Sequence, residues 1–159
     1  MSLGNVSIVS QSGQMLPSSV MWPVAAAATT IYAGEPVKLV STYAVPSADA
    51  EPGTGTPTFL GIAASTSTQT AATAGTVNVF YPVPGLIYAC KTKTAAELNT
   101  AAELQALIGV PVLFDLTSSV YTVDTAATAS TSGLVIVGGD TVNSIVYFMV
   151  RSSVVLGTI

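Results

Sequence analysis

Short apolar or alternating runs, separated by turn-forming residues, fill most of the chain from residue 29 onward. Runs of about four to eight residues between Gly, Pro, Asn and Asp are typical of β-strands. In 76–81 the apolar side chains alternate with polar ones, whereas 59–63 is a continuous apolar run around one glycine. The pattern predicts about ten short strands, at 31–32, 37–40, 59–63, 76–81, 86–90, 110–116, 120–123, 134–137, 145–150 and 154–156.

Turn chemistry between these runs predicts how some of them connect. The residues AGEP at 33–36 form a turn before 37–40, and VPGL at 83–86 has Pro and Gly where a type II turn requires them. We therefore expect 86–90 to return as the partner strand of 76–81. Two glycines at 138–139 predict a tight reversal and a hairpin with the long strand 145–150.

Two polar features interrupt the strand pattern. The Ser-, Thr- and Gln-rich stretch 65–73 has no apolar period, so we expect a mobile loop. The segment 94–109 has a helical period and contains two near copies, TAAEL at 94–98 and at 100–104, each with the Thr-x-x-Glu spacing of a capping box. A helix running unbroken through both copies would place the first glutamate on its apolar face. We predict that the helix begins at Thr100 and ends at Gly109, after a turn.

The first 28 residues differ from the rest, because they hold a single short alternating run and two prolines. Four large apolar residues there have no obvious strand partner, and burying each is worth about 1.5–3 kcal/mol. These residues, which we expect to contact a neighbouring subunit or another binding partner, are Met15, Leu16, Met21 and Trp22. The sequence thus predicts an extended N-terminal arm, 1–28, and one β-rich domain, 29–159. The expected fold is all-β, a small β-sandwich or barrel with one short α-helical insertion at 94–109.

The composition indicates a protein that works in an assembly. Half of the residues are apolar and only 8% are charged, where an ordinary soluble domain has about 25% charged residues. A surface packed against other subunits benefits from few charges, because each buried ion costs desolvation. We therefore expect a homo-oligomer.

The charge distribution argues against nucleic acid and membranes as partners. The net charge is −4, and the basic residues, which form no patch able to follow phosphates, are Lys38, Lys91, Lys93 and Arg151. The uncharged stretches 1–34 and 52–90 are interrupted by Gly, Pro, Ser and Thr, so neither predicts a membrane-spanning helix. No basic residue precedes position 38, so the N-terminus lacks the charged region of a secretory signal.

Catalytic and metal-binding chemistry is sparse in the sequence. The absence of histidine removes the commonest general base and metal ligand. Cys90 lies beside two lysines that could activate a thiol, but on a strand it shares a face with Leu86 and Tyr88, which favours a buried, inert cysteine. We expect neither an enzyme nor a metal or cofactor site.

Acidic and aromatic residues offer two further candidate sites. Three aspartates, Asp115, Asp124 and Asp140, lie singly near the ends of different runs, which favours turn capping over paired acids or calcium binding. A sugar-binding platform is an alternative use of the aromatic residues, whose default role is core packing. They are Trp22, Tyr32, Tyr43, Tyr81, Tyr88 and Tyr147.

Four short motifs occur in an order that resembles the capsid decoration (cement) proteins of tailed bacteriophages. They are AGEPV at 33–37, FLGIA at 59–63, AGTV at 74–77 and VPGLIY at 83–88, and the resemblance covers residues 30–155. It implies a β-domain, commonly a homotrimer, that binds the major capsid protein on the virion exterior after synthesis in the host cytoplasm. It implies head stabilisation as the function. The uncharged arm and the Thr-rich loop depart from the family pattern, which leaves the mode of attachment open.

Two other classes of protein fit the same sequence features. One is a secreted or cell-surface β-module, such as an adhesin or a carbohydrate-binding domain, although the missing signal sequence argues against it. The other is a minor fibre or tail component of the virion, which the sequence does not separate from decoration.

Overall fold

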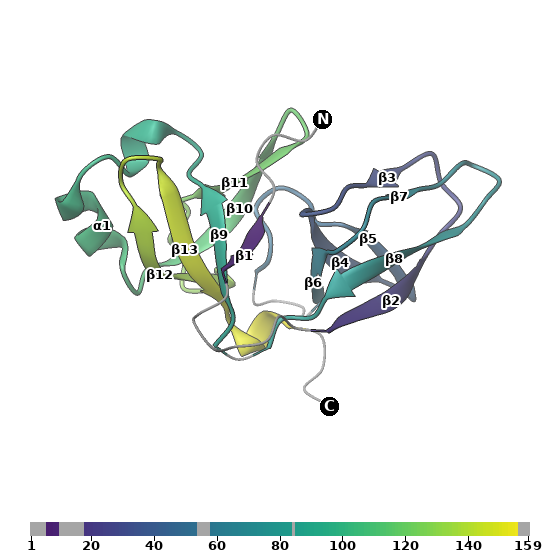
Figure 1. Ribbon diagram of the computed structural model, residues 1–159. Coiled ribbons are helices and arrows are strands. Elements are labelled where there is room, and N and C mark those ends of the chain that lie inside the picture. The colour runs from purple at the N-terminus through teal and green to yellow at the C-terminus, as the bar shows by residue number, and fades with distance from the viewer. Residues whose placement is uncertain (1–5, 10–17, 54–57, 84, 156–159) are drawn as a thin grey trace.

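The computed structural model of the chain describes residues 6–9, 18–53, 58–83 and 85–155. Within them lie thirteen strands in three sheets, one α-helix and two short 3-10 helices, which confirms the predicted all-β class with one helical insertion. Figure 1 shows two lobes side by side, each built around its own sheet. We call them the first barrel and the second barrel.

The first barrel is an antiparallel five-stranded sheet that curls on itself. Its order is β2 (Ser19–Val24), β8 (Gly75–Phe80), β6 (Phe59–Ala63), β4 (Pro36–Val40) and β5 (Tyr43–Pro46). Cα atoms of the end strands β2 and β5 lie within 8 Å of each other, so the sheet is nearly closed. A two-stranded sheet, β3 (Thr30–Ile31) with β7 (Ser67–Thr68), extends it. The inward side chains form an aliphatic core of Val24, Ile31, Val37, Ala44, Leu60, Ala63, Val77 and Val79.

The second barrel is a six-stranded sheet whose last strand returns to its second. The order is β1 (Ser7–Val9), β9 (Ile87–Lys91), β13 (Ile145–Val150), β12 (Leu134–Asp140), β10 (Pro111–Thr117) and β11 (Val120–Asp124). Closure occurs just beyond β9, where Thr92 forms a parallel bridge with Val123 and the Lys93 amide donates to the Val123 carbonyl at 2.9 Å. The chain segment after β9 therefore links the edge strand β11 back to the second strand of the sheet.

Strand β6 belongs to both cores and unites the barrels. Every residue of β6 is buried. Phe59 and Ile62 pack in the core of the second barrel, while Leu60 and Ala63 face the core of the first. Gly61 between them has φ +140°, and a Cβ there would collide with the Phe80 carbonyl, which explains the glycine within this apolar run.

The core of the second barrel is rich in aromatic side chains. The Tyr88 and Phe148 rings stack at 5.7 Å, and Phe114 meets Phe148 edge-on at 5.6 Å. The connection from β5 to β6 lies along β10, where the Phe114 amide donates to the Glu51 carbonyl at 2.8 Å and Leu116 donates to the Asp49 carboxylate at 2.9 Å. The two barrels are thus joined by packing and by hydrogen bonds.

The helix α1 (Ala101–Leu107) begins where the sequence predicts. Thr100 accepts a hydrogen bond from the Glu103 amide at 3.2 Å, and the Glu103 carboxylate accepts one from the Thr100 amide at 2.9 Å, a complete capping box. The first copy forms the 3-10 turn η1 (Ala95–Glu97), as expected. Gly109, with φ +83°, follows the end of the helix.

The predicted pairing of 76–81 with 86–90 is wrong. Strand β8 pairs with β2 and β6 in the first barrel, whereas β9 pairs with β1 and β13 in the second. The Leu86 amide does donate to the Val83 carbonyl at 3.1 Å, and Gly85 has φ +82°. That turn, whose Pro84 lies outside the described residues, carries the chain from one barrel to the other.

Three local expectations also need correction. Gly138 and Gly139 lie inside β12 beside a β-bulge, and the reversal to β13 occurs at 141–144, although the hairpin itself is confirmed. The polar stretch 65–73 contains β7 and buries Ser67 and Gln69 rather than forming only a loop. In place of a strand at 154–156, the 3-10 helix η2 (Ser152–Val154) ends the described chain with Val155.

The expectation of a separate N-terminal arm is wrong for its described part. Strand β2 pairs with β8 along its whole length, and β1 pairs with β9. Val6 and Val24 are both buried in the cores. Six- and three-residue strands need partners whatever their position in the chain, because unpaired backbone groups are costly.

Candidate interaction surface

The described residues contain no cluster of metal ligands. In residues 6–9, 18–53, 58–83 and 85–155, no three His, Cys, Asp or Glu side chains are grouped to hold a metal ion. No helix in the same ranges has the length and apolar character needed to cross a membrane. Cys90 is buried, and burial raises the pKa of its thiol to about 12, so the reactive thiolate is strongly disfavoured at neutral pH.

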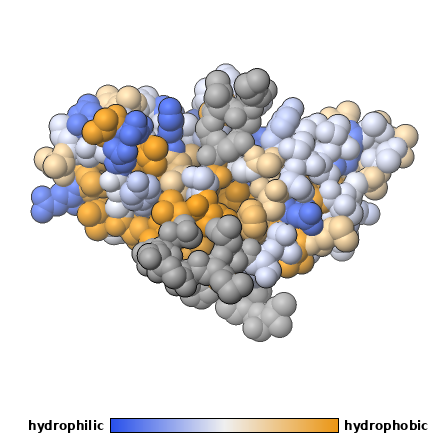
Figure 2. Space-filling view, in the orientation of Figure 1, coloured by the Kyte–Doolittle hydropathy of each residue, from blue (hydrophilic) through white to orange (hydrophobic). Residues whose placement is uncertain are grey.

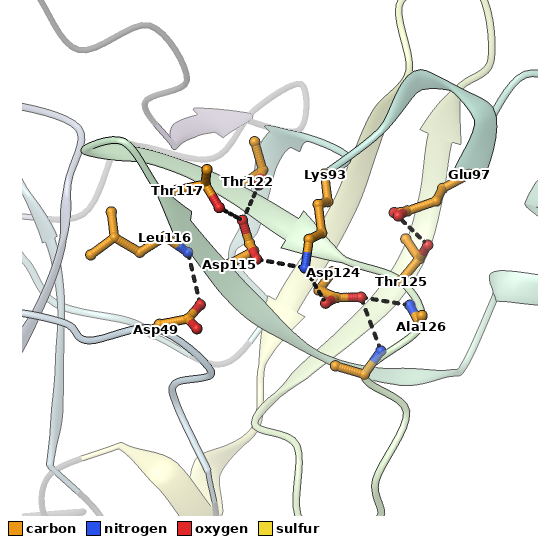
Figure 3. A network of polar contacts seen from close by, with 11 residues as sticks. Asp49, Lys93, Glu97, Asp115, Leu116, Thr117, Thr122, Asp124, Thr125 and Ala126 are labelled. Carbon is orange, nitrogen blue, oxygen red and sulfur yellow. Dashed lines mark hydrogen bonds and ion pairs between the residues drawn. The ribbon is translucent and has the colours of Figure 1, made fainter.

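Two aspartates that are separated in sequence converge on one lysine. The Lys93 ammonium lies 2.7 Å from the Asp115 carboxylate and 3.1 Å from that of Asp124 (Figure 3). Strands β10 and β11 carry the aspartates, and Lys93 follows β9. The antiparallel register brings the two carboxylates to one side of the hairpin, which the sequence signals of single strands did not reveal.

Electrostatics make this cluster a structural link. Burial raises the pKa of Asp115, but hydrogen bonds from Lys93, Thr117 and Thr122 outweigh it and hold the pKa below its ordinary value. Hydrogen bonds to Asp115 and Asp124 raise the pKa of Lys93. The two carboxylates share one ammonium, and the cluster ties the end of β9 to the β10–β11 hairpin near the closure of the barrel.

The remaining aspartate of the sequence prediction caps its own turn. The Asp140 carboxylate accepts hydrogen bonds from the Val142 amide at 2.9 Å and the Asn143 side chain at 2.6 Å, which lower its pKa. Asp124 likewise accepts from the Ala126 amide at 2.9 Å (Figure 3). Turn capping accounts for both residues, and nothing draws Asp140 toward the other two.

Charge is distributed unevenly over the two barrels. Eight of the charged residues belong to the second barrel and its loops, namely Lys91, Lys93, Glu97, Glu103, Asp115, Asp124, Asp140 and Arg151. The other four, Glu35, Lys38, Asp49 and Glu51, lie in β4, in the turn before it and in the connection to the second barrel. Strands β2, β3, β5, β6, β7 and β8 carry no charged residue at all.

The four charged residues of the first barrel are each engaged. Lys38 pairs with Glu51 at 2.6 Å beside a cavity of about 280 Å³. Asp49 accepts from the Leu116 amide, and the buried Glu35 carboxylate accepts from the Tyr32 amide at 3.0 Å. The outer surface of this barrel therefore presents hydroxyl, backbone and apolar groups, and Figure 2 shows it mostly in pale, near-neutral colours.

Exposed apolar side chains gather on three neighbouring strands of the first barrel. Met21 on β2 is 66% exposed, and Val20 before it is 48% exposed. Val40 and Tyr43, which face each other across the β4–β5 hairpin, are 49% and 41% exposed. Val20 shares the face of Trp22 and Val24, which pack with the core, so Met21 points outward. Because β2 adjoins β5 where the barrel closes, we call the outward residues Met21, Val40 and Tyr43 the β2–β5 surface.

The predicted contact residues fare differently. Met21 lies on the β2–β5 surface, whereas Trp22 beside it packs partly against the core of the first barrel. Met15 and Leu16 lie outside the described residues. Val40 and Tyr43 were not predicted as contact residues. Finding them would have required knowing that β2 pairs at the end of the sheet, and no local sequence pattern encodes that pairing.

The six aromatic residues considered for a sugar platform do not share one surface. Tyr88 is fully buried in the core of the second barrel. Tyr147 lies on β13 of that barrel, while Trp22 and Tyr43 lie on the first barrel. Core packing accounts for Tyr88, and the exposed tyrosines of the described residues, Tyr32 and Tyr43, belong to the first barrel.

Comparison with known proteins finds no related protein. No family model matches the chain, and neither a curated protein nor a solved structure matches it. Its function is therefore inferred from its own residues.

Proposed function

We propose that the chain is a structural virion protein that binds the outer surface of an assembled phage capsid and stabilises the lattice of major capsid subunits. The observation that carries the proposal is the sparsely charged outer surface of the first barrel, whose Lys38 is paired with Glu51, with the β2–β5 surface at its centre. The order of the four sequence motifs points to the same role. Binding takes place through this surface, while the charged second barrel faces away from the head.

The physical chemistry of the β2–β5 surface suits a permanent contact. Burying Met21, Val40 and Tyr43 gains about 25 cal/mol for each Å² of apolar area removed from water. No ionised group of strands β2 or β5 has to be desolvated, because neither contains one. Binding to the assembled lattice and not to single capsid subunits then shifts the equilibrium toward the lattice by mass action.

The test uses heads that lack the protein, prepared from the phage that encodes it. Adding the protein back should raise the temperature at which heads disrupt. Met21→Lys should weaken binding at least tenfold, because it places a charge in an apolar contact, while its far-UV spectrum stays unchanged. Val142→Lys, on an 88% exposed turn residue of the second barrel, adds the same charge as the matched control.

Salt dependence gives the test a second readout. An apolar contact without ion pairs depends weakly on ionic strength. Binding should therefore persist from low salt to about 1 M, where the Debye length is only about 3 Å. Naked heads as stable as decorated ones, or binding lost at moderate salt, would rule out the proposed role and favour a surface module or a fibre component.

A further inference from the structure

The second barrel has an outer face that is apolar where a free barrel would be polar. Along β13 the inward residues Val146 and Phe148 are buried in the core, so Ile145, Tyr147 and Met149 point outward. All three outward residues are only half-buried. Strands apolar on both faces are typical of sheets covered on both sides.

The antiparallel registers align these outward residues in rows across the sheet. One row runs over five adjacent strands, because Val9 pairs with Ile87, and Met149 pairs with Val135, which pairs with Pro111. Every member of this row is apolar and remains partly exposed. Figure 2 shows apolar surface gathered over the lower part of the second barrel, toward its junction with the first.

A second row at the other end of the same face carries both signs of charge. Ile145 on β13 pairs with Lys91 on β9 and with Asp140 on β12. With strands about 4.8 Å apart, the ammonium and the carboxylate are separated by two strand spacings, too far for a direct ion pair. Lys91 is exposed and forms no ion pair with any described residue. Asp140 binds only the amides of its own turn.

We propose that the outer face of β9, β13 and β12 binds the same face of a second copy of the chain across a two-fold axis parallel to β13. The axis exchanges the β9 and β12 sides, so Lys91 of each copy faces Asp140 of the other. The apolar row meets its own counterpart. Two-fold contacts require such a self-complementary patch, and face-to-face sheets pack about 10 Å apart.

This pairing gives the expected homo-oligomer a defined geometry and does not rest on capsid binding. It replaces the trimer implied by the family resemblance, because a ring of three would set this face against a different surface. The β2–β5 surface, on the other barrel, stays available for a further partner.

A cysteine placed near the axis tests the geometry directly. Met149→Cys should give a covalent dimer with a short bifunctional thiol reagent, because the two copies of this position face each other across the axis, about 10 Å apart and too far for a direct disulfide. The native Cys90 is buried and does not compete for the reagent. Ala72→Cys, exposed in the turn at 70–73 of the first barrel and away from the face, is the matched control and should remain mostly unlinked.

A charge placed in the apolar row tests the contact itself. At tens of micromolar, light scattering on the wild-type protein should give a mass twice the 16.0 kDa of one chain. Val135→Lys should halve that mass with an unchanged far-UV spectrum, while Ala72→Lys, on an exposed residue of the first barrel, leaves the mass unchanged. A monomeric wild type, or an oligomer whose mass is insensitive to Val135→Lys, would overturn the proposal, as would equal cross-linking of both cysteine variants.

The two surfaces can be separated experimentally. Met21→Lys should leave the dimer intact and weaken capsid binding. If this variant bound heads as tightly as wild type, the result would contradict the capsid contact alone. Val135→Lys should abolish the dimer. If the resulting single chains still bind heads, the dimer contact through the outer face of β9, β13 and β12 is supported and the capsid proposal stands.

Discussion

At the scale of single residues, Lys93 is the counter-ion of two aspartates in the second barrel. Its ammonium compensates Asp115, whose side chain is only 8% exposed, and Asp124, whose side chain is 21% exposed. Replacing Lys93 by Met leaves a nearly buried carboxylate without a counter-ion, which is a recognised cause of large destabilisation. We expect Lys93→Met to lower the melting temperature at pH 7.

The pH dependence of that loss identifies its cause. Because the folded-state pKa of Asp115 is lowered, its ion pair contributes stability above its unfolded pKa of about 4, and the contribution is lost as the pH falls through the folded value. The gap in melting temperature between wild type and Lys93→Met should therefore narrow below about pH 4. In an Asp115→Asn background the lysine substitution should cost less. A gap constant from pH 7 to pH 3 would contradict the electrostatic explanation.

At the scale of elements, the duplicated TAAEL sequence provides an internal control for helix capping. Thr100 caps α1 through its side chain, whereas Thr94 in the first copy makes no side-chain capping bond. We expect Thr100→Ala to lower the free energy of unfolding by about 0.5–2 kcal/mol. Thr94→Ala should change it by less than about 0.5 kcal/mol. Equal effects in denaturant titrations would show that the capping box does not stabilise α1.

Elements were predictable where their signals are local. The helix start at Thr100, the turn at 33–36 and the hairpin of β12 with β13 each follow from residues within a few positions of each other. The pairing of β8 with β2, and not with β9, depends on segments more than fifty residues apart, which propensity and turn chemistry do not encode. The same limit hid the meeting of Asp115 with Asp124 and the apolar rows on the second barrel, because both depend on register.

At the scale of the whole molecule, β6 makes the two barrels one cooperative unit. Phe59 from the first barrel is 1% exposed in the core of the second, so unfolding either barrel exposes surface of both. We expect Phe59→Ala to lower the free energy of unfolding by about 3–5 kcal/mol. Both barrels should lose stability together.

Two native probes measure this coupling without engineered labels. Trp22, the single tryptophan, reports the first barrel through its fluorescence, and the buried thiol of Cys90 reports opening of the second through its reactivity. Coincident denaturant transitions are expected for wild type and for Phe59→Ala, as for one two-state unit. Separate midpoints would show that the barrels unfold independently.

The uneven distribution of charge over the molecule also determines which reagents can report on its contacts. Lysine amines occur only at positions 38, 91 and 93, and the Lys38 side chain is 21% exposed against 41% for that of Lys93. Amine-directed cross-linkers would therefore sample mainly the second barrel, and trypsin would release the sequence from 39 to 91 as one long peptide. A cross-linking map of decorated heads would record few contacts of the first barrel even at full occupancy. Photo-activated reagents that insert into C–H bonds would record its contacts instead.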